Sequence, residues 1–333
     1  MSTKHRLLSL TLLLIGVLLV AACEPLVPTP TPQIIVITAT PSPGPTITPT
    51  PSLTPTPDVT VTPTPSPSPT AALCPETEGQ VIVFDTFDSE IAGRNMPYRV
   101  YVPPCYFESQ RRYPVVYLLH GAASDDTQWQ DLGVTETLDR GLSLNQYPPM
   151  LLVMPYGAHL LPNSDFPPDP SMETFILDEL IPRVERDFCV WEDRDYRAIG
   201  GISRGGFWAL SIAMRHPEVF SAVGGHSPSL DTDNTPPEFN PLDLALSAPF
   251  IDTLRIYLDN GASDPVRPEV EMLSNRLVER QIAHEYVINP LGGHDEAYWS
   301  SHMADYLAFY GGTAADGWPR EAGQLPSCLE PSP

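Results

Sequence analysis

The sequence predicts an α/β fold with a mostly parallel sheet that is covered by helices on both faces. Short apolar runs such as Val115–Leu119 and Met150–Pro155 are typical of strands that are buried on both faces. Helical patterns lie between the later runs, for example at Glu173–Phe188, where apolar residues recur at helical spacing. Strands that alternate with helices favour parallel pairing, because each helix can carry the chain back across the sheet.

The individual elements follow from the same patterns. Two strands at Gln80–Phe87 and Tyr98–Val102 precede the first expected helix and should pair antiparallel. The later strands and helices are expected, in chain order, at Val115–Leu119, Met150–Pro155, Glu173–Phe188, Arg197–Gly200, Arg204–Arg215, Phe220–Gly224, Leu254–Leu258, Pro268–Gln281, Glu285–Ile288 and Asp295–Tyr310.

The first residues have the pattern of a bacterial export signal. A basic start at Lys4 to Arg6 precedes the apolar run Leu7–Val20, and small residues precede Cys23. The run is shorter than the ~20 apolar residues that cross a bilayer, so an uncleaved anchor and ordinary secretion are the weaker alternatives. We therefore predict a lipoprotein signal peptide at residues 1–22, with Cys23 as the lipid-attachment residue. The protein is expected in a bacterial cell envelope, outside the cytoplasm.

Residues 23–73 form a tract rich in Pro, Thr and Ser. Proline fixes φ and lacks an amide donor, so the tract is expected to be a disordered, extended tether. The short apolar stretch Ile34–Ile37 is the one place where a strand could form, and no prediction is built on it. Residues 74–333 then make a single folded domain, a length that suits one α/β unit.

The chain is strongly acidic, with 41 Asp and Glu against 18 Lys and Arg and a net charge of −23. This balance disfavours nucleic acid and anionic membrane surfaces as partners, so a membrane contact is expected only through the lipid anchor. No Cys-x-x-Cys or Cys/His cluster suggests a metal site, and we expect neither a metal nor a cofactor.

The cysteines suit an oxidising compartment. Besides Cys23 there are Cys74, Cys105, Cys189 and Cys328, and four cysteines allow three pairings. Export favours two disulfides. Proximity in the sequence favours Cys74 with Cys105, which leaves Cys189 with Cys328.

The clearest chemical motif is Gly-Ile-Ser-Arg-Gly at residues 201–205. It follows an expected strand and opens an expected helix, which is the context of a nucleophile elbow. Glycines two residues before and after the serine let the neighbouring chain approach closely, and the helix N-terminus favours a developing negative charge. Ser203 is therefore the predicted nucleophile.

A serine nucleophile needs a general base and an acid that orients the base. His294 lies in Leu-Gly-Gly-His-Asp, just beyond the last expected strand, and is the predicted base. Asp264 follows the preceding strand, so the chain order is Ser, Asp, His, as expected for this kind of elbow. Asp259 lies nearer the end of that strand and is the rival acid.

An oxyanion hole needs two backbone amides, and one should belong to Arg204, the residue after the serine. The other should come from the loop that begins Leu-His-Gly-Ala-Ala at residue 119. Gly121 permits close approach there, and the N–H of Ala122 is the predicted second donor. His120 is expected to be structural.

With these motifs the chain resembles the esterase-D-like family of α/β-hydrolases. The family includes feruloyl esterases, acetyl-xylan esterases, S-formylglutathione hydrolases, enterochelin esterases and mycolyltransferases. The resemblance covers roughly Tyr98 to Tyr310 and implies the α/β-hydrolase fold. The family's Gly-x-x-Asp turn supports Asp264 over Asp259. Arg204 stands where methionine is common, which leaves the amide donor intact but bears on the acyl pocket.

The resemblance implies a serine carboxylic-ester hydrolase that works through an acyl-enzyme. Because the chain is expected outside the cytoplasm, cytosolic glutathione chemistry is disfavoured, and the polyanion enterochelin suits an acidic chain poorly. We therefore expect feruloyl or acetyl esters of polysaccharide as substrates. An acyltransferase of the mycolyltransferase type and a non-catalytic surface-binding module are the alternatives. The aromatic candidates for stacking on a sugar or ferulate ring, with core packing as the alternative, are Trp129, Tyr156, Phe166 and Trp299.

Overall fold

A computed structural model describes residues 31–37, 75–230, 235–312, 317–319 and 326–329, and the fold is given for these. The predicted signal peptide with Cys23, most of the predicted tether, and Cys74 lie outside the described residues. In the part of the chain that is described, no helix is both long enough and apolar enough to cross a membrane.

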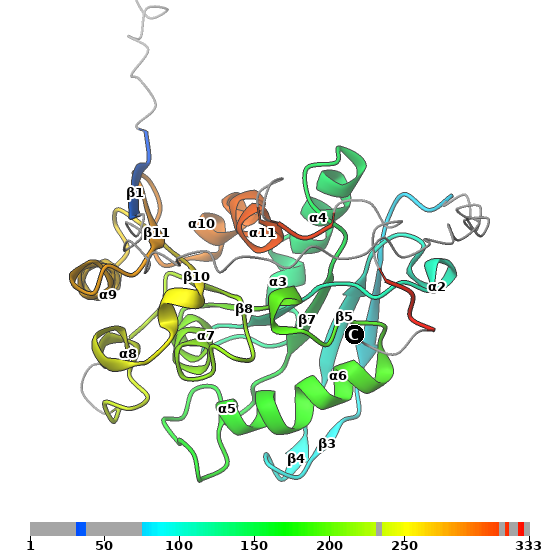
Figure 1. The fold of residues 1–333 in the computed structure, drawn as a ribbon, viewed down its shortest axis with the longest axis horizontal. Helices are drawn as coiled ribbons and strands as arrows, with labels where there is room; N and C mark the ends of the chain where they lie inside the picture. Colours follow the sequence, from blue (N-terminus) through cyan, green and yellow to red (C-terminus); the bar gives the residue numbers. More distant parts are fainter. Residues whose placement is uncertain (1–30, 38–74, 231–234, 313–316, 320–325, 330–333) are drawn as a thin grey trace, which may run out of the picture. The chain divides into compact units, whose positions relative to one another are not determined.

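A nine-stranded mixed sheet organises the domain, in the order β1-β11-β10-β9-β8-β6-β7-β5-β2 (Figure 1). The strands from β11 to β7 in this order pair in parallel, whereas β1, β5 and β2 each pair antiparallel with their neighbours. Their bounds are β1 Gln33–Ile37, β2 Gln80–Phe84, β5 Tyr98–Val102, β6 Val115–Leu119, β7 Leu151–Pro155, β8 Arg197–Ile202, β9 Ala222–His226, β10 Arg255–Gly261 and β11 His284–Asn289, and a separate small ladder pairs β3 Asp88–Ser89 with β4 Arg94–Asn95.

Helices cover both faces of the sheet (Figure 1). One face packs against α5 to α9, and the other packs against α3, α4, α10 and α11. The α-helices are α2 Tyr106–Ser109, α3 Gln128–Asp131, α4 Val134–Ser143, α5 Met172–Thr174, α6 Ile181–Asp187, α7 Arg204–Arg215, α8 Pro241–Ser247, α9 Arg267–Glu279, α10 Glu296–Ser301 and α11 Met303–Gly311.

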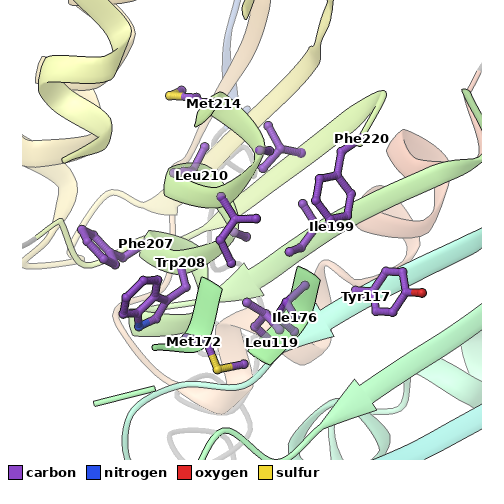
Figure 2. Close-up of a cluster of buried hydrophobic side chains, with 14 of the residues drawn as sticks. Tyr117, Leu119, Met172, Ile176, Ile199, Phe207, Trp208, Leu210, Met214 and Phe220 are labelled. Atoms are coloured by element: carbon purple, nitrogen blue, oxygen red, sulfur yellow. The ribbon is translucent and has the colours of Figure 1, made fainter. Parts of the chain in front are cut away.

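Strand β6 shows why the central strands are apolar throughout. Val115, Tyr117 and Leu119 belong to the core on the α7 face, whereas Val116 and Leu118 belong to the core on the α11 face. Successive side chains of a strand point to opposite faces, so a strand between two helical layers needs apolar residues at every position. Figure 2 shows the α7-face core, in which Tyr117, Leu119 and Ile199 of the sheet meet side chains of α7 and of the π-helical stretch Phe175–Leu180.

Most predicted elements are present, and β5, β6 and α7 have the predicted bounds. Strand β9 lies two residues later than predicted. The predicted helix Asp295–Tyr310 is divided at His302 into α10 and α11. The predicted helix Glu173–Phe188 contains a π-helical stretch between α5 and α6. The predicted α/β-hydrolase fold agrees with this mixed sheet and its helical layers.

The structure differs from the predicted tether at Gln33–Ile37. These residues form β1, an edge strand antiparallel to β11, with Ile34 opposite Val287 and Val36 opposite Glu285. The stretch is rich in β-branched residues and contains no proline, so its amides are able to join the exposed edge of β11.

The disulfide between Cys189 and Cys328 is confirmed, with Cα atoms 5.6 Å apart. It joins the end of α6 to a segment near the C-terminus, where Arg111 and Ser327 form an isolated bridge. Cys105 is also disulfide-bonded. Because Cys74 lies outside the described residues, its pairing with Cys105 stays a prediction.

Candidate active site

The sheet order reverses at β6, which pairs with β7 on one side and with β8 on the other. The loops that follow β6 and β8 therefore leave the sheet side by side at its carboxyl edge. In α/β sheets this reversal point is where ligands usually bind. Both the predicted nucleophile and the predicted oxyanion loop follow these two strands.

Ser203 forms a sharp turn between β8 and α7. Its φ of 56° and ψ of −118° lie outside the regions that ordinary residues favour. A Cβ at Gly201 would lie 2.2 Å from the backbone of Gly205, and a Cβ at Gly205 would lie 2.4 Å from the carbonyl oxygen of His120. Only glycine fits at either position, so the motif spacing reflects the close approach of three backbone segments.

The structure brings the three predicted catalytic residues together. His294 Nε2 lies 2.8 Å from Ser203 Oγ. His294 Nδ1 lies 3.1 and 3.2 Å from the two carboxylate oxygens of Asp264. His294 comes from the loop between β11 and α10, and Asp264 from the loop between β10 and α9. The arrangement lets the imidazole accept the serine proton while the carboxylate holds the Nδ1 proton.

The surroundings of Asp264 favour its charged form. Burial by itself would raise the pKa of this carboxyl, but hydrogen bonds from His294 and from the N–H of Val266 outweigh burial and lower the pKa below its ordinary value. The buried hydroxyl of Ser227 faces the same carboxylate and acts in the same direction, although it makes no hydrogen bond of ordinary geometry. A carboxylate that stays ionised can stabilise an imidazolium.

Asp259, the rival acid, lies elsewhere. Its carboxylate is fully buried and accepts hydrogen bonds from His226 and from the hydroxyls of Tyr298 and Tyr306. Asp259 is still part of β10, so its side chain lies between the sheet and the helices α10 and α11. Asp264, in contrast, lies in the loop beyond the end of the strand.

The predicted oxyanion loop lies directly against the nucleophile. A Cβ at Gly121 would lie 3.6 Å from Cβ of Ser203. The N–H of Gly121 donates to Gln128 Oε1 at 2.8 Å, which removes it as an oxyanion donor and leaves Ala122 as the next amide in this loop. Gln128 was not predicted, because a lone glutamine in the sequence carries no such signal.

His120 has a structural environment, as expected. Burial lowers its pKa below the ordinary value, so the ring stays neutral. Its Nδ1 lies 2.7 Å from the carbonyl oxygen of Gly121, and its Nε2 accepts the N–H of Gly157 at 2.9 Å. Both ring nitrogens therefore brace the loops beside Ser203.

The side chain of Arg204 is directed away from the serine. Its guanidinium lies over the ring of Phe207, 4.1 Å from the centroid, and donates to the carbonyl oxygens of Leu161 and Asn163. Arginine at this position thus fastens the loop after β7 to the start of α7. Its backbone N–H remains at the helix N-terminus, where the oxyanion is expected.

The aromatic candidates divide into two groups. Trp129 and Phe166 are buried, and Phe166 stacks on Phe239, so both pack in the core. Trp299 is also buried, but its ring meets His294 edge-on at 5.1 Å. Tyr156 is half-buried and stacks on His120, so it alone keeps a partly accessible ring beside the site.

The described residues contain one group with the spacing of metal ligands, formed by Glu76, Cys105 and Glu108. Cys105 is disulfide-bonded, so its sulfur is not a thiolate. The two exposed carboxylates that remain do not make a metal site by themselves.

Comparison with protein families identifies the chemistry of this arrangement. Residues 89–310 match the model of an esterase family described as "Putative esterase". The chain belongs to this esterase family. The matched region includes the elbow, the oxyanion loop, Asp264 and His294.

The chain is similar in part to two bacterial proteins that are named as esterases. It is 35% identical over 146 residues to an esterase of Mycobacterium tuberculosis, a segment that covers 42% of this chain and 31% of that one. It is 32% identical over 151 residues to an endo-1,4-beta-xylanase/feruloyl esterase of Xylanibacter ruminicola, covering 42% of this chain and 20% of that one. The esterase therefore matches less than a third of the length of these relatives.

A solved structure shares the fold of the esterase. A ferulic acid esterase superposes with a TM-score of 0.63 at 24% identity, over 70% of this chain and 98% of that one. This likeness shows the α/β-hydrolase fold. Membership of the family assigns the chain to the esterases.

Proposed function

We propose that Ser203, His294 and Asp264 are the catalytic residues of an esterase that removes feruloyl or acetyl groups from polysaccharide outside the cytoplasm. The observation that carries the proposal is the continuous chain of contacts from Asp264 through His294 to Ser203 Oγ, with the 2.8 Å separation at the serine. Nucleophile and base are within hydrogen-bond reach, and the base is oriented by a third group.

The reaction has two steps. His294 Nε2 takes the proton of Ser203 as Oγ attacks the ester carbonyl carbon, and the resulting oxyanion is bound by the amides of Ala122 and Arg204. Collapse of this intermediate breaks the bond to the alcohol, which leaves with the proton from His294. Water then attacks the acyl-enzyme with the same base, and the acid product is released.

Two observations support a bulky, polymer-linked substrate. Ser203 and His294 are partly exposed, Ala122 is exposed, and Leu291 in the loop that carries His294 is 66% exposed. A partly exposed nucleophile suits an ester on a chain too large to be enclosed. The Xylanibacter relative, named as a xylanase/feruloyl esterase, supports the same substrate class.

The proposal includes a lipid anchor at Cys23. The apolar run and the small residues before Cys23 support a lipoprotein signal. Residues 24–32 would then lie between the anchor and β1, the strand at the edge of the sheet. Such an arrangement suits an enzyme that meets insoluble polymer at the cell surface.

A substrate panel tests the proposal. The purified protein is assayed with p-nitrophenyl acetate, butyrate and octanoate, with methyl ferulate and with acetylated xylan, and the Ser203→Ala variant is the control. We expect the highest kcat/KM with methyl ferulate or the acetyl esters. A clear preference for octanoate, or acyl transfer to glycerol or trehalose in place of hydrolysis, would contradict the substrate assignment while leaving the esterase chemistry intact.

A further inference from the structure

A buried polar cluster lies beside the triad and is not used in the reaction described above. We call it the Asp259 network; its members are His226, Asp259, Tyr298, Tyr306 and Tyr310. The side chains of His226 and Asp259 are fully buried, and each of the three tyrosines is at most 3% exposed. Burying this many polar groups costs free energy unless each one has a hydrogen-bond partner, and each polar side chain of this network has one.

Asp259 is the common acceptor of the network. Its Oδ1 lies 2.9 Å from His226 Nδ1, and its Oδ2 accepts the hydroxyls of Tyr298 at 2.5 Å and Tyr306 at 2.9 Å. His226 Nε2 lies 2.8 Å from the hydroxyl of Tyr310. Burial raises the pKa of all three tyrosines, so they keep their protons and act as donors.

The sheet is shaped to admit this network. A Cβ at Gly200 would lie 1.6 Å from the hydroxyl oxygen of Tyr310, and a Cβ at Gly224 would lie 2.4 Å from the same oxygen. Gly200 is in β8 and Gly224 is in β9, two neighbouring strands at the centre of the sheet. Larger residues there would exclude Tyr310 and break the contact with His226.

The network touches the elbow on one side. The carbonyl oxygen of His226 accepts the N–H of Ser203 at 3.0 Å. The carbonyl oxygen of Asp259 accepts the N–H of Ser227 at 2.8 Å. The contact between the His226 imidazole and the Asp259 carboxylate therefore joins the ends of β9 and β10, and β9 binds the amide of the nucleophile.

On the other side the network touches the loop that carries the base. Tyr298 lies in the first turn of α10, and its N–H donates to the side chain of the N-cap residue Asp295, which directly follows His294. A Cβ at Gly292 would lie 2.4 Å from the Tyr298 ring, so the ring also packs against the loop before His294. Tyr306, in contrast, lies on α11, which carries no residue of the proposed triad.

We propose that Asp259 and Tyr298 are positioning residues that hold the loop of His294 at the correct distance from Ser203. The hydrogen bond between Tyr298 and Asp259 connects the helix that begins beside the base to the strand beside the nucleophile. The inference rests on the proposed roles of Ser203 and His294 and is independent of the natural substrate. Misplacement of reacting groups by about 1 Å can cost on the order of 100-fold in rate, so one such bond can affect turnover.

The test compares Tyr298→Phe with Tyr306→Phe. Each variant removes one hydroxyl from the same oxygen of Asp259, but only Tyr298 is attached to the base loop. The measurements are kcat and KM on p-nitrophenyl acetate, the rate of labelling by a fluorophosphonate, and the free energy of unfolding in urea. We expect Tyr298→Phe to lower kcat and the labelling rate about 10-fold or more with KM within about twofold, and Tyr306→Phe to lower kcat less than about threefold.

Two controls keep the result decisive. The Tyr298 hydroxyl also accepts the side-chain N–H of Asn289 at 2.9 Å, so Asn289→Ala tests that bond separately and is expected to retain kcat within about threefold. Active-site titration corrects kcat for any unfolded fraction. Equal losses in kcat for the two tyrosine variants, or a loss shared by Asn289→Ala, would overturn the positioning role. Full activity in Ser203→Ala would instead overturn the proposed function.

Discussion

His294 Nε2 lies 2.8 Å from Ser203 Oγ, although 91 residues separate them in the chain. The serine is placed by the turn after β8, and the histidine by the loop after β11. Because parallel strands end at one edge of the sheet, their loops meet there. The proposed reaction depends on this meeting point and on the contacts that maintain it.

Ser203→Ala should lower kcat by about 10⁴-fold or more, because alanine has no hydroxyl to form the acyl-enzyme. The free energy of unfolding should change little. The measurement is kcat on p-nitrophenyl acetate, with Ser143→Ala at the end of α4 as a matched serine control. A Ser203→Ala variant that keeps a tenth of the activity would refute the nucleophile.

Asp264→Asn should lower kcat by about 10⁴-fold, because an amide favours the wrong tautomer of His294. Asp259→Asn should lower kcat by no more than about 100-fold. It should, however, cost about 3 kcal/mol in unfolding free energy, because the amide cannot accept all three donors. Both variants are measured for kcat/KM near pH 8 and for urea unfolding. If Asp259→Asn has the larger loss of activity, the wrong carboxylate has been assigned to the triad.

The double variant Cys189→Ser and Cys328→Ser should lower the free energy of unfolding by about 2–5 kcal/mol, since the bond closes a long loop. The kcat should remain close to that of the parent protein, because the bond lies at the end of α6, away from the triad. Urea unfolding with and without reductant provides the measurement. A reductant that destabilises the double variant as much as the parent would show that another disulfide carries the effect.

The contribution of His216 to stability should depend on pH. A hydrogen bond with Glu173 is the main reason that the pKa of His216 is raised, with burial acting against it. Since the folded protein binds the proton more tightly, this stabilisation is complete below the unfolded pKa of about 6.5 and is lost as the pH rises through the folded pKa.

The difference in unfolding free energy between the parent and His216→Gln should therefore be larger at pH 6 than at pH 8. The parent and the variant must be compared at each pH, because other histidines also titrate. Burial lowers the pKa of His120 and His284, and their contribution makes the free energy of unfolding increase as the pH rises. A difference that is the same at both pH values would show that the Glu173 contact has no net linkage to protonation.

Cys23→Ser should abolish lipid attachment, because serine has no thiol to accept a diacylglycerol. In cells that express the full chain, we expect the parent protein in the membrane fraction and the variant in the soluble fraction. Mass spectrometry of the N-terminal peptide provides an independent readout. A variant that remains integral to the membrane would favour an uncleaved anchor.

The sequence by itself determined the strands, the elbow and the order of the three proposed catalytic residues. Val115–Leu119 is apolar at every position because both faces of β6 are covered, so its strand character is visible locally. The glycines around Ser203 are also visible as a short motif, although Gly205 meets the carbonyl oxygen of His120 from a distant part of the chain. Such features appear as short patterns in the sequence, so they can be recognised without the fold.

Only the tertiary structure decided which carboxylate meets the base and what the other one does. Asp259 and Asp264 are five positions apart in similar sequence surroundings. The partners of Asp259 lie on β9, α10 and α11, whereas the partner of Asp264 lies on the loop after β11. Those partners depend on strand register and on where each helix crosses the sheet. Hydrophobic periodicity shows which side of an element is buried, but it does not show which distant polar group will lie opposite, and this is why the Asp259 network could not be predicted.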